Sequence, residues 1–249
     1  IVTQRQTAVE QNKYWGFATT QSSVAVSLFM KRTKLSYYEL LELLLVKFVN
    51  DPASPPISEI PPIDTCDTEQ QTVSNLTVSK FDLMHRFIRL WRKTGWKMWE
   101  LDLLIRNPKI GNNAINGDTL TNLKRFKQLQ EKLRLPFETL LAFYGEINRE
   151  IRINPEKSDV IIQPLYNKLF QSLAVTNPLD SHFQAIDNTN VPINLDGAIV
   201  LGVNPAGAPY FGYSPVPTIL SAYALQQSDF DLLVNKADKH LYVSSLSTL

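Results

Sequence analysis

The amino-acid sequence predicts an all-α protein made of stacked irregular helical hairpins, with a loop-rich or short β-hairpin insert near residues 176–217. Three observations predict this class. Apolar residues recur at helical spacing along much of the chain, tight turns separate several predicted helices, and one hairpin pattern occurs four times. The composition agrees, because 44% hydrophobic and 20% charged residues are typical of a globular chain and not of a disordered one.

The first predicted hairpin begins with the apolar element VAVSLFM. Ser36 and Glu39 then have the spacing of a capping box, in which each side chain accepts a hydrogen bond from the other residue's backbone N–H. The next helix, LLELLLVKFV at residues 40–49, is apolar nearly all round, so we expect it to be buried. Residues 51–71 contain five of the fifteen prolines and predict a long covering loop.

The second predicted hairpin has the sequence MHRFIRLWRKTGWKMWELDLLI, residues 84–105. Gly95 suits the left-handed position that follows a helix end, and a second helix is expected from about residue 98 to 106. Apolar residues of the first helix share one face, which predicts that they lie in the core: Phe81, Met84, Phe87, Ile88 and Trp91.

Further helices are predicted after the polar loop at residues 107–117. Asp118 is the expected N-cap of a helix through about residue 133, and Pro136 lies in the first turn of the next helix, PFETLLAFY. Another helix is expected near residues 161–173.

The C-terminal part of the chain carries fewer helical signals. AIVLGV, residues 198–203, is a possible short strand within the insert. A final helix pair is predicted at residues 217–225 and 229–237, with Ser228 as the N-cap of its second helix.

The repeated hairpin consists of a helix, a tight turn, and a second helix that starts with an aromatic residue and an acid. An acid in the first turn interacts favourably with the helix dipole. The uneven spacing predicts stacked hairpins, an architecture of extended scaffolds, and not a regular solenoid. The copies lie at residues 31–44, 92–105, 133–144 and 225–236, with the pairs Tyr38-Glu39, Trp99-Glu100, Phe137-Glu138 and Phe230-Asp231.

One candidate interaction face consists of four basic residues on the first helix of the second hairpin. Their side chains are able to contact phosphates or lipid head groups. Alternatively, their stems cover apolar surface and their charged groups pair with Glu100, Asp102 or another helix. The second interpretation is favoured, because Lys plus Arg is 25 and Asp plus Glu is 24, a net charge of +1, whereas dedicated nucleic-acid binders carry a basic excess. The face comprises Arg86, Arg89, Arg92 and Lys93.

The sequence predicts no catalytic, cofactor-binding or metal-binding residue, and therefore no enzyme. Cys66 is the single cysteine, and the acids around it would raise the pKa of its thiol. The three histidines, His85, His182 and His240, are scattered without metal-ligand spacing. A small hydrolase that uses Cys66 and a histidine is therefore the least favoured hypothesis.

Five segments appear in an order that resembles a known family. They are KYWGF (13–17), FMKRTKLSYYELLELLLVKFVN (29–50), Cys66, LMHRFIRLWRKTGWKMWELDLLI (83–105) and HLYVSSLSTL (240–249). The pattern resembles the A component of Tc insecticidal toxin complexes and the related Salmonella plasmid virulence A protein. This chain has Lys34 where that family usually has a glycine, and DTEQQTV where it has an acid-rich run.

The resemblance implies a structural segment of an α-helical shell in a pore-forming, receptor-binding translocator that delivers a toxic enzyme into host cells. It implies a secreted or extracellular bacterial toxin, although the chain shows no signal peptide. Residues 1–249 would then be a fragment of the shell domain: hairpins at 1–145, a helix plus irregular insert at 146–217, and a truncated closing helix pair at 218–249.

The implied partners are other copies of the A subunit, in a pentamer, and the B and C toxin components. A host-cell receptor and the membrane would be contacted by other regions, and no cofactor or nucleic acid is expected. The alternative from a different class is a helix-turn-helix nucleic-acid-binding module that uses the basic helix at residues 84–93.

Overall fold

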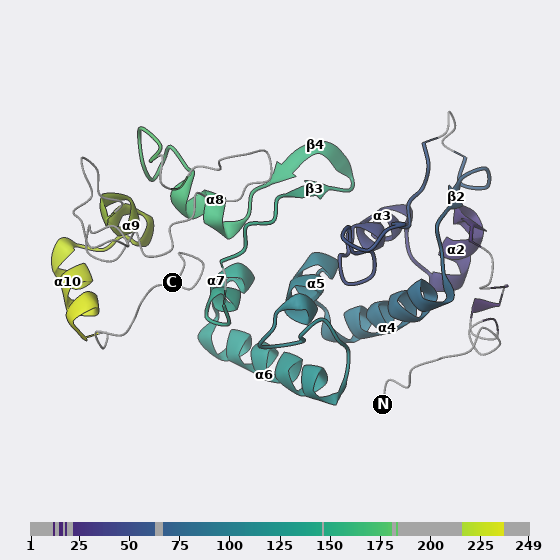
Figure 1. Ribbon diagram of the computed structural model, residues 1–249, viewed down its shortest axis with the longest axis horizontal. Helices are drawn as coiled ribbons and strands as arrows, with labels where there is room; N and C mark the ends of the chain where they lie inside the picture. Colours follow the sequence, from purple (N-terminus) through teal and green to yellow (C-terminus); the bar gives the residue numbers. More distant parts are fainter. Residues whose placement is uncertain are drawn as a thin grey trace. The chain divides into compact units, whose positions relative to one another are not determined.

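A computed structural model describes residues 12, 15, 16, 18, 22–62, 67–145, 147–180, 183 and 216–236. The chain divides into two compact units, residues 1–129 and 130–249 (Figure 1). About half of the described residues are helical, and two small two-stranded antiparallel sheets accompany the helices. The fold is therefore helix-rich with small β elements, and the prediction of an all-α chain is not confirmed.

The first unit contains two complete helical hairpins. The strands β1 and β2 pair in antiparallel fashion, with Val24 opposite Val73, and β1 leads directly into the first helix. The elements are β1 (Val24–Ala25), α2 (Val26–Thr33), α3 (Tyr37–Leu45), β2 (Thr72–Val73), α4 (Val78–Thr94), α5 (Met98–Arg106) and α6 (Gly117–Leu133), which crosses into the second unit.

Left-handed residues mark the turn of each of the four predicted repeat copies. A residue with positive φ follows the first helix of each hairpin: Lys34 at 61°, Gly95 at 74°, Arg134 at 54° and Ala224 at 51°. Lys34, Gly95 and Arg134 each donate a backbone hydrogen bond to the carbonyl four residues earlier, which closes the helix end. The four copies thus share a left-handed residue at the turn, even where that residue is not glycine.

The position of the acid corrects the predicted register in the last copy. Glu39 accepts a hydrogen bond from the Ser36 N–H at 2.7 Å, and Asp229 accepts one from the Gln226 N–H at 3.1 Å. Helix α10 (Gln227–Lys236) therefore starts earlier than predicted, and its first-turn acid is Asp229, not Asp231. Ser228 is inside this helix and is not its N-cap.

The core of the first unit contains most of the predicted apolar stripe of α4. Phe81, Met84, Phe87 and Ile88 are buried, and the Trp15 ring centroid lies 5.0 Å from that of Phe81.

Trp91 does not belong to this core, contrary to prediction. It is only half-buried, whereas Trp96, just beyond the turn, is 7% exposed and packs edge-on against Phe126 with ring centroids 5.9 Å apart. Helical spacing alone did not distinguish the last turn of α4 from its centre.

Helix α3 is shorter and less buried than predicted. It ends at Leu45, whose side chain is 61% exposed, and only Leu40 and Leu43 are buried within it. The buried Asn50 then anchors the proline-rich loop: its amide group donates to the carbonyl of Ser58 at 2.7 Å and its side-chain oxygen accepts from the Ser58 N–H at 2.6 Å.

Asn116, not Asp118, caps helix α6. The Asn116 side-chain oxygen accepts from the Thr119 N–H at 2.9 Å, and the Leu120 N–H donates to the Asn116 carbonyl. Asn is as good an N-cap as Asp, so the two residues were not separable by type alone.

The second unit contains a β-hairpin that the sequence did not predict. Strands β3 and β4 pair with Ile153 opposite Ile161. Residues 161 and 162 therefore belong to β4 and not to the helix predicted at 161–173, and that helix starts at Leu165. The β-branched run Val160-Ile161-Ile162 favours a strand. The elements are α7 (Phe137–Ala142), β3 (Arg152–Asn154), β4 (Lys157–Ile162), α8 (Leu165–Phe170), α9 (Val216–Tyr223) and α10.

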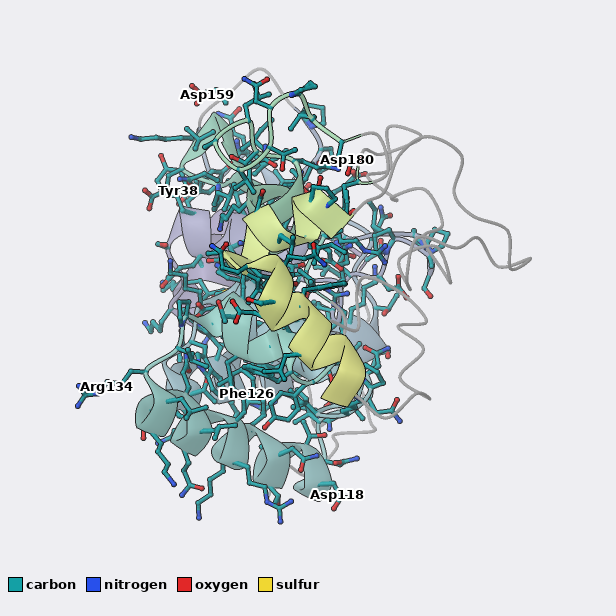
Figure 2. All side chains as sticks on the ribbon, turned by 90° about the vertical axis from the view of Figure 1, so that its left-hand side faces the viewer. Tyr38, Asp118, Phe126, Arg134, Asp159 and Asp180 are labelled. Atoms are coloured by element: carbon teal, nitrogen blue, oxygen red, sulfur yellow. The ribbon has the colours of Figure 1, made fainter. Side chains whose placement is uncertain are left out.

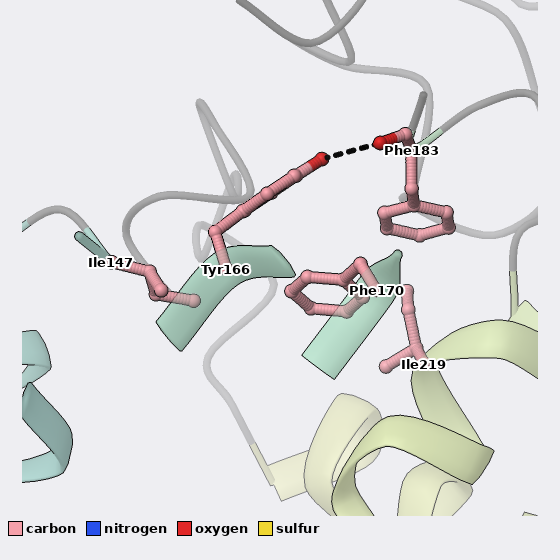
Figure 3. Close-up of a cluster of buried hydrophobic side chains, with 5 residues drawn as sticks. All are labelled: Ile147, Tyr166, Phe170, Phe183 and Ile219. Carbon is pink, nitrogen blue, oxygen red and sulfur yellow. Dashed lines mark hydrogen bonds between the residues drawn. The ribbon is translucent and has the colours of Figure 1, made fainter. Parts of the chain in front are cut away.

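An aromatic cluster forms the core of the second unit (Figure 3). The rings of Phe170 and Phe183 stack with centroids 4.7 Å apart, and the Tyr166 hydroxyl donates to the Phe183 carbonyl at 3.4 Å. Burial raises the pKa of Tyr166, so its hydroxyl stays a donor. Most of the predicted insert, including AIVLGV at 198–203, lies outside the described residues.

Candidate interaction face and helix-end contacts

In the predicted basic face Arg86 is half-buried and the other three residues are exposed, and two of the four, Arg86 and Arg92, bind backbone carbonyls. Arg86 lies 3.6 Å from the Asp82 carboxylate and donates to the carbonyl of Ile115. Arg89 and Lys93 are exposed on α4. The four predicted residues therefore do not act as one surface.

Arg92 binds the end of the preceding hairpin's first helix. Its guanidinium donates to the carbonyl of Thr33, the last residue of α2, and to that of Lys34 at 3.3 Å. The last carbonyls of a helix lack partners within the helix and carry partial negative charge, so a cation there is stabilising. The prediction that an arginine pairs with another helix is correct for Arg92.

Lys127 makes the equivalent contact one hairpin later. Its ammonium, on α6, donates to the carbonyl of Thr94, the last residue of α4, and lies 5.6 Å from the centre of the Trp96 ring. Thr33 and Thr94 occupy the same position before the left-handed residue. A cation from the next first helix therefore binds the end of α2 and of α4 alike, and Lys127 was missed by sequence reasoning.

Glu42 links the second helices of the two hairpins. The backbone N–H of Trp99, in the first turn of α5, donates to the Glu42 carboxylate of α3. Burial raises the pKa of Glu42, the Trp99 hydrogen bond and nearby Lys97 oppose this, and the charges of Glu39 and Glu100 add to it. Glu42 thus stabilises the start of α5 at a cost in desolvation.

The predicted acidic partners of the arginines have other roles. Glu100 accepts from the Lys97 N–H at 2.8 Å at the start of α5. The buried Asp102 accepts from the Phe48 N–H at 2.8 Å and from Arg106 at 3.0 Å. Asp102 therefore holds the turn after α3 against α5.

Helix α5 offers no exposed face to a nucleic acid. All nine of its residues are described, and each is buried or half-buried; Met98, Leu101, Leu104 and Ile105 are completely or almost completely inaccessible. A recognition helix must place several side chains in the major groove. This geometry argues against base reading by the α4–α5 pair.

A second polar cluster, which sequence reasoning missed, lies in the second unit around Glu138. This carboxylate accepts from the Asn148 amide at 2.6 Å and pairs with Lys168 at 3.2 Å and Arg152 at 3.8 Å. Its side chain is 11% exposed. The cluster joins α7, β3 and α8 through ion pairs and a hydrogen bond.

The remaining candidates do not form a site in the described part of the chain. His85 is buried in α4, while Cys66, His182 and His240 lie outside the described residues. Among the described residues, no group of three or more metal-ligating side chains occurs. No helix within the described ranges is long and apolar enough to cross a membrane.

No family model, no curated protein and no solved structure matches the chain. The contacts between helix ends are therefore the main structural basis for any functional hypothesis.

Proposed function

We propose that this chain is a structural segment of the helical shell of a pore-forming, receptor-binding toxin translocator that delivers a toxic enzyme into host cells. The sequence segments that resemble the A component of Tc toxin complexes motivate this assignment. The chain itself performs no catalysis in this proposal. Its partners are other copies of the same subunit and the B and C components, and the protein acts outside the bacterial cell.

The observation that supports the proposal is that polar side chains of residues 83–105, one of the segments that carry the resemblance, bind backbone groups. Arg86, Arg92, Glu100 and Asp102 all contact backbone groups of the chain. Glu100 binds within its own helix end, whereas the contacts of Arg86, Arg92 and Asp102 connect neighbouring hairpins, which is the requirement of a wall-forming scaffold. The buried α5 makes a helix-turn-helix module the weaker alternative.

The complete polypeptide that contains this chain tests the proposal. Its coding sequence would be read on both sides of the segment and expressed in full, and mass photometry and planar-bilayer recording would follow. We expect a pentamer that opens ion-conducting channels. A monomer without channel activity would contradict the proposal.

A further inference from the structure

A chemically reactive dipeptide lies at the start of α6, beside the Asp118 that Figure 2 labels. Asn116 precedes Gly117, and no other asparagine of the sequence is followed by glycine. The backbone nitrogen after an asparagine can attack the side-chain amide carbon, and glycine favours this attack because it lacks a Cβ and adopts the widest range of φ and ψ. Both residues are exposed, so water reaches them.

The backbone nitrogen of Gly117 is available as the nucleophile. Gly117 is the first residue of α6, where the helix itself offers no acceptor for the N–H, and this N–H donates to no described group. The positive end of the helix dipole stabilises the amide anion that forms when the N–H loses its proton. A Cβ added at Gly117 would meet no atom within 4 Å, so the space around the nitrogen is open.

The side-chain carbonyl of Asn116 is polarised for attack. Its Oδ1 accepts the Thr119 N–H at 2.9 Å. A donor held at this oxygen stabilises the negative charge that develops there when the amide carbon is attacked, as in an oxyanion hole. Among the described residues, none accepts a hydrogen bond from the Nδ2 group of this exposed side chain. The amide nitrogen is therefore free to leave as ammonia.

We propose that Asn116 is a self-modification site that converts to aspartate and isoaspartate. The Gly117 nitrogen loses its proton to solvent base and bonds to Cγ of Asn116. The Cγ–Nδ2 bond breaks as Nδ2 takes up a proton and leaves as ammonia, and water then opens the succinimide at either of its carbonyls. The chain thus gains a water molecule and releases ammonia, without an oxidant or reductant. This goes beyond the proposed function, which assigns no chemistry to the chain.

The two products affect α6 differently. Aspartate keeps an oxygen that accepts the Thr119 N–H, and its negative charge is favourable at a helix N-terminus. Isoaspartate carries the main chain through the former side chain, so the group that caps α6 is lost. We therefore expect isoaspartate to loosen the start of α6 and the Ile115 carbonyl that Arg86 binds.

Incubation of the 249-residue chain at mildly alkaline pH and physiological temperature tests the inference. Peptide mass spectrometry with electron-transfer fragmentation distinguishes asparagine, aspartate and isoaspartate at each position. We expect Asn116 to react before Asn112 and Asn113, which are exposed in the same loop but precede Asn and Ala, and isoaspartate to accompany aspartate. Gly117→Ala should slow the reaction severalfold without disturbing the fold, because its Cβ has open space.

The same incubation in guanidinium chloride separates the folded site from the dipeptide alone, and circular dichroism verifies which samples are folded. Reaction of Asn116 in both the native and the denatured chain supports the proposal. Reaction in the denatured chain alone would show that the cap protects the side chain, and would overturn it. Equal rates in the wild-type and Gly117→Ala chains, equal rates at Asn112 and Asn113, or aspartate without isoaspartate would also overturn it.

Discussion

The burial and the structural role of single residues in this chain depend on small differences in position along a helix. Trp91 and Trp96 are five residues apart and both aromatic, yet one lies at the half-exposed edge of α4 and the other in the core. Arg89 and Arg92 are both exposed on α4, yet Arg92 binds the carbonyls at the end of α2. Residue type alone therefore assigns neither burial nor role.

Substitution of the two tryptophans by alanine should have unequal effects. Trp96→Ala removes a buried ring that packs on Phe126, and we expect it to lower the free energy of unfolding by about 3–5 kcal/mol. Trp91→Ala leaves a smaller cavity because the ring is half-exposed, so its effect should be clearly smaller. Urea unfolding followed by circular dichroism measures both, and equal losses would contradict the assignment of Trp96 to the core.

Substitutions at the two turn residues with left-handed backbone should change the free energy of unfolding in opposite directions. Lys34 has φ of 61°, where a Cβ is unfavourable, so Lys34→Gly should raise the free energy of unfolding by about 1 kcal/mol. Gly95, at 74°, is the matched position, and Gly95→Ala should lower it by a similar amount. Thermal melts of both variants provide the measurement. Destabilisation by Lys34→Gly would show that the lysine side chain matters more than its backbone conformation.

The buried carboxyl of Glu42 predicts a pH dependence of stability. Because the folded chain raises the pKa of Glu42, it binds this proton more tightly than the unfolded chain does. The contribution to stability is present below the ordinary glutamate pKa of 4.5 and is lost as pH rises through the raised value. Glu42→Gln keeps an acceptor for the Trp99 N–H and cannot ionise.

The melting temperature of Glu42→Gln should therefore exceed that of the wild-type chain by a margin that increases as pH rises from the ordinary glutamate pKa of 4.5 through the raised value. Scanning calorimetry at several pH values measures this margin. A margin that is constant with pH, or that shrinks as pH rises, would be inconsistent with a raised pKa.

At the scale of elements, the sequence predicts helices and turns well where capping and periodicity agree. Helix α5 has the predicted bounds, residues 98–106, and the turn at Gly95 is confirmed. The hairpin of β3 and β4 was missed, because β3 has only three residues and the end of β4 was assigned to the helix predicted at 161–173. Lys127 was missed because its partner is a backbone carbonyl 33 residues away, which has no signature in side-chain sequence.

Helix-end binding by Arg92 should contribute measurably to the stacking of the hairpins. Arg92→Gln removes the charge beside the α2 carbonyls, and we expect a loss of about 1 kcal/mol in the free energy of unfolding, within the range for a cation at a helix C-terminus. Arg89→Gln is the matched control on the same helix, with an expected change below about 0.5 kcal/mol. Chemical denaturation compares the two, and an equal loss in both would exclude a specific role for Arg92.

At the scale of the molecule, the two compact units have separate polar clusters and separate cores. In the first, cations and Glu42 bind helix ends and connect successive hairpins. In the second, the Glu138 carboxylate joins a helix, a strand and the next helix through Asn148, Arg152 and Lys168. Local stability should therefore respond to substitutions unit by unit.

Glu138→Gln tests this separation. The neutral side chain leaves Arg152 and Lys168 without their carboxylate partner, and loss of a largely buried ion-pair partner is strongly destabilising. We expect hydrogen exchange, measured by mass spectrometry, to accelerate in α7, β3 and α8 while α4 and α5 keep their protection. Glu131→Gln, at an exposed position in the same unit, is the control for charge alone. Faster exchange in α4 as well would mean that the two units unfold as one cooperative body, and the local role of Glu138 would then have to be abandoned.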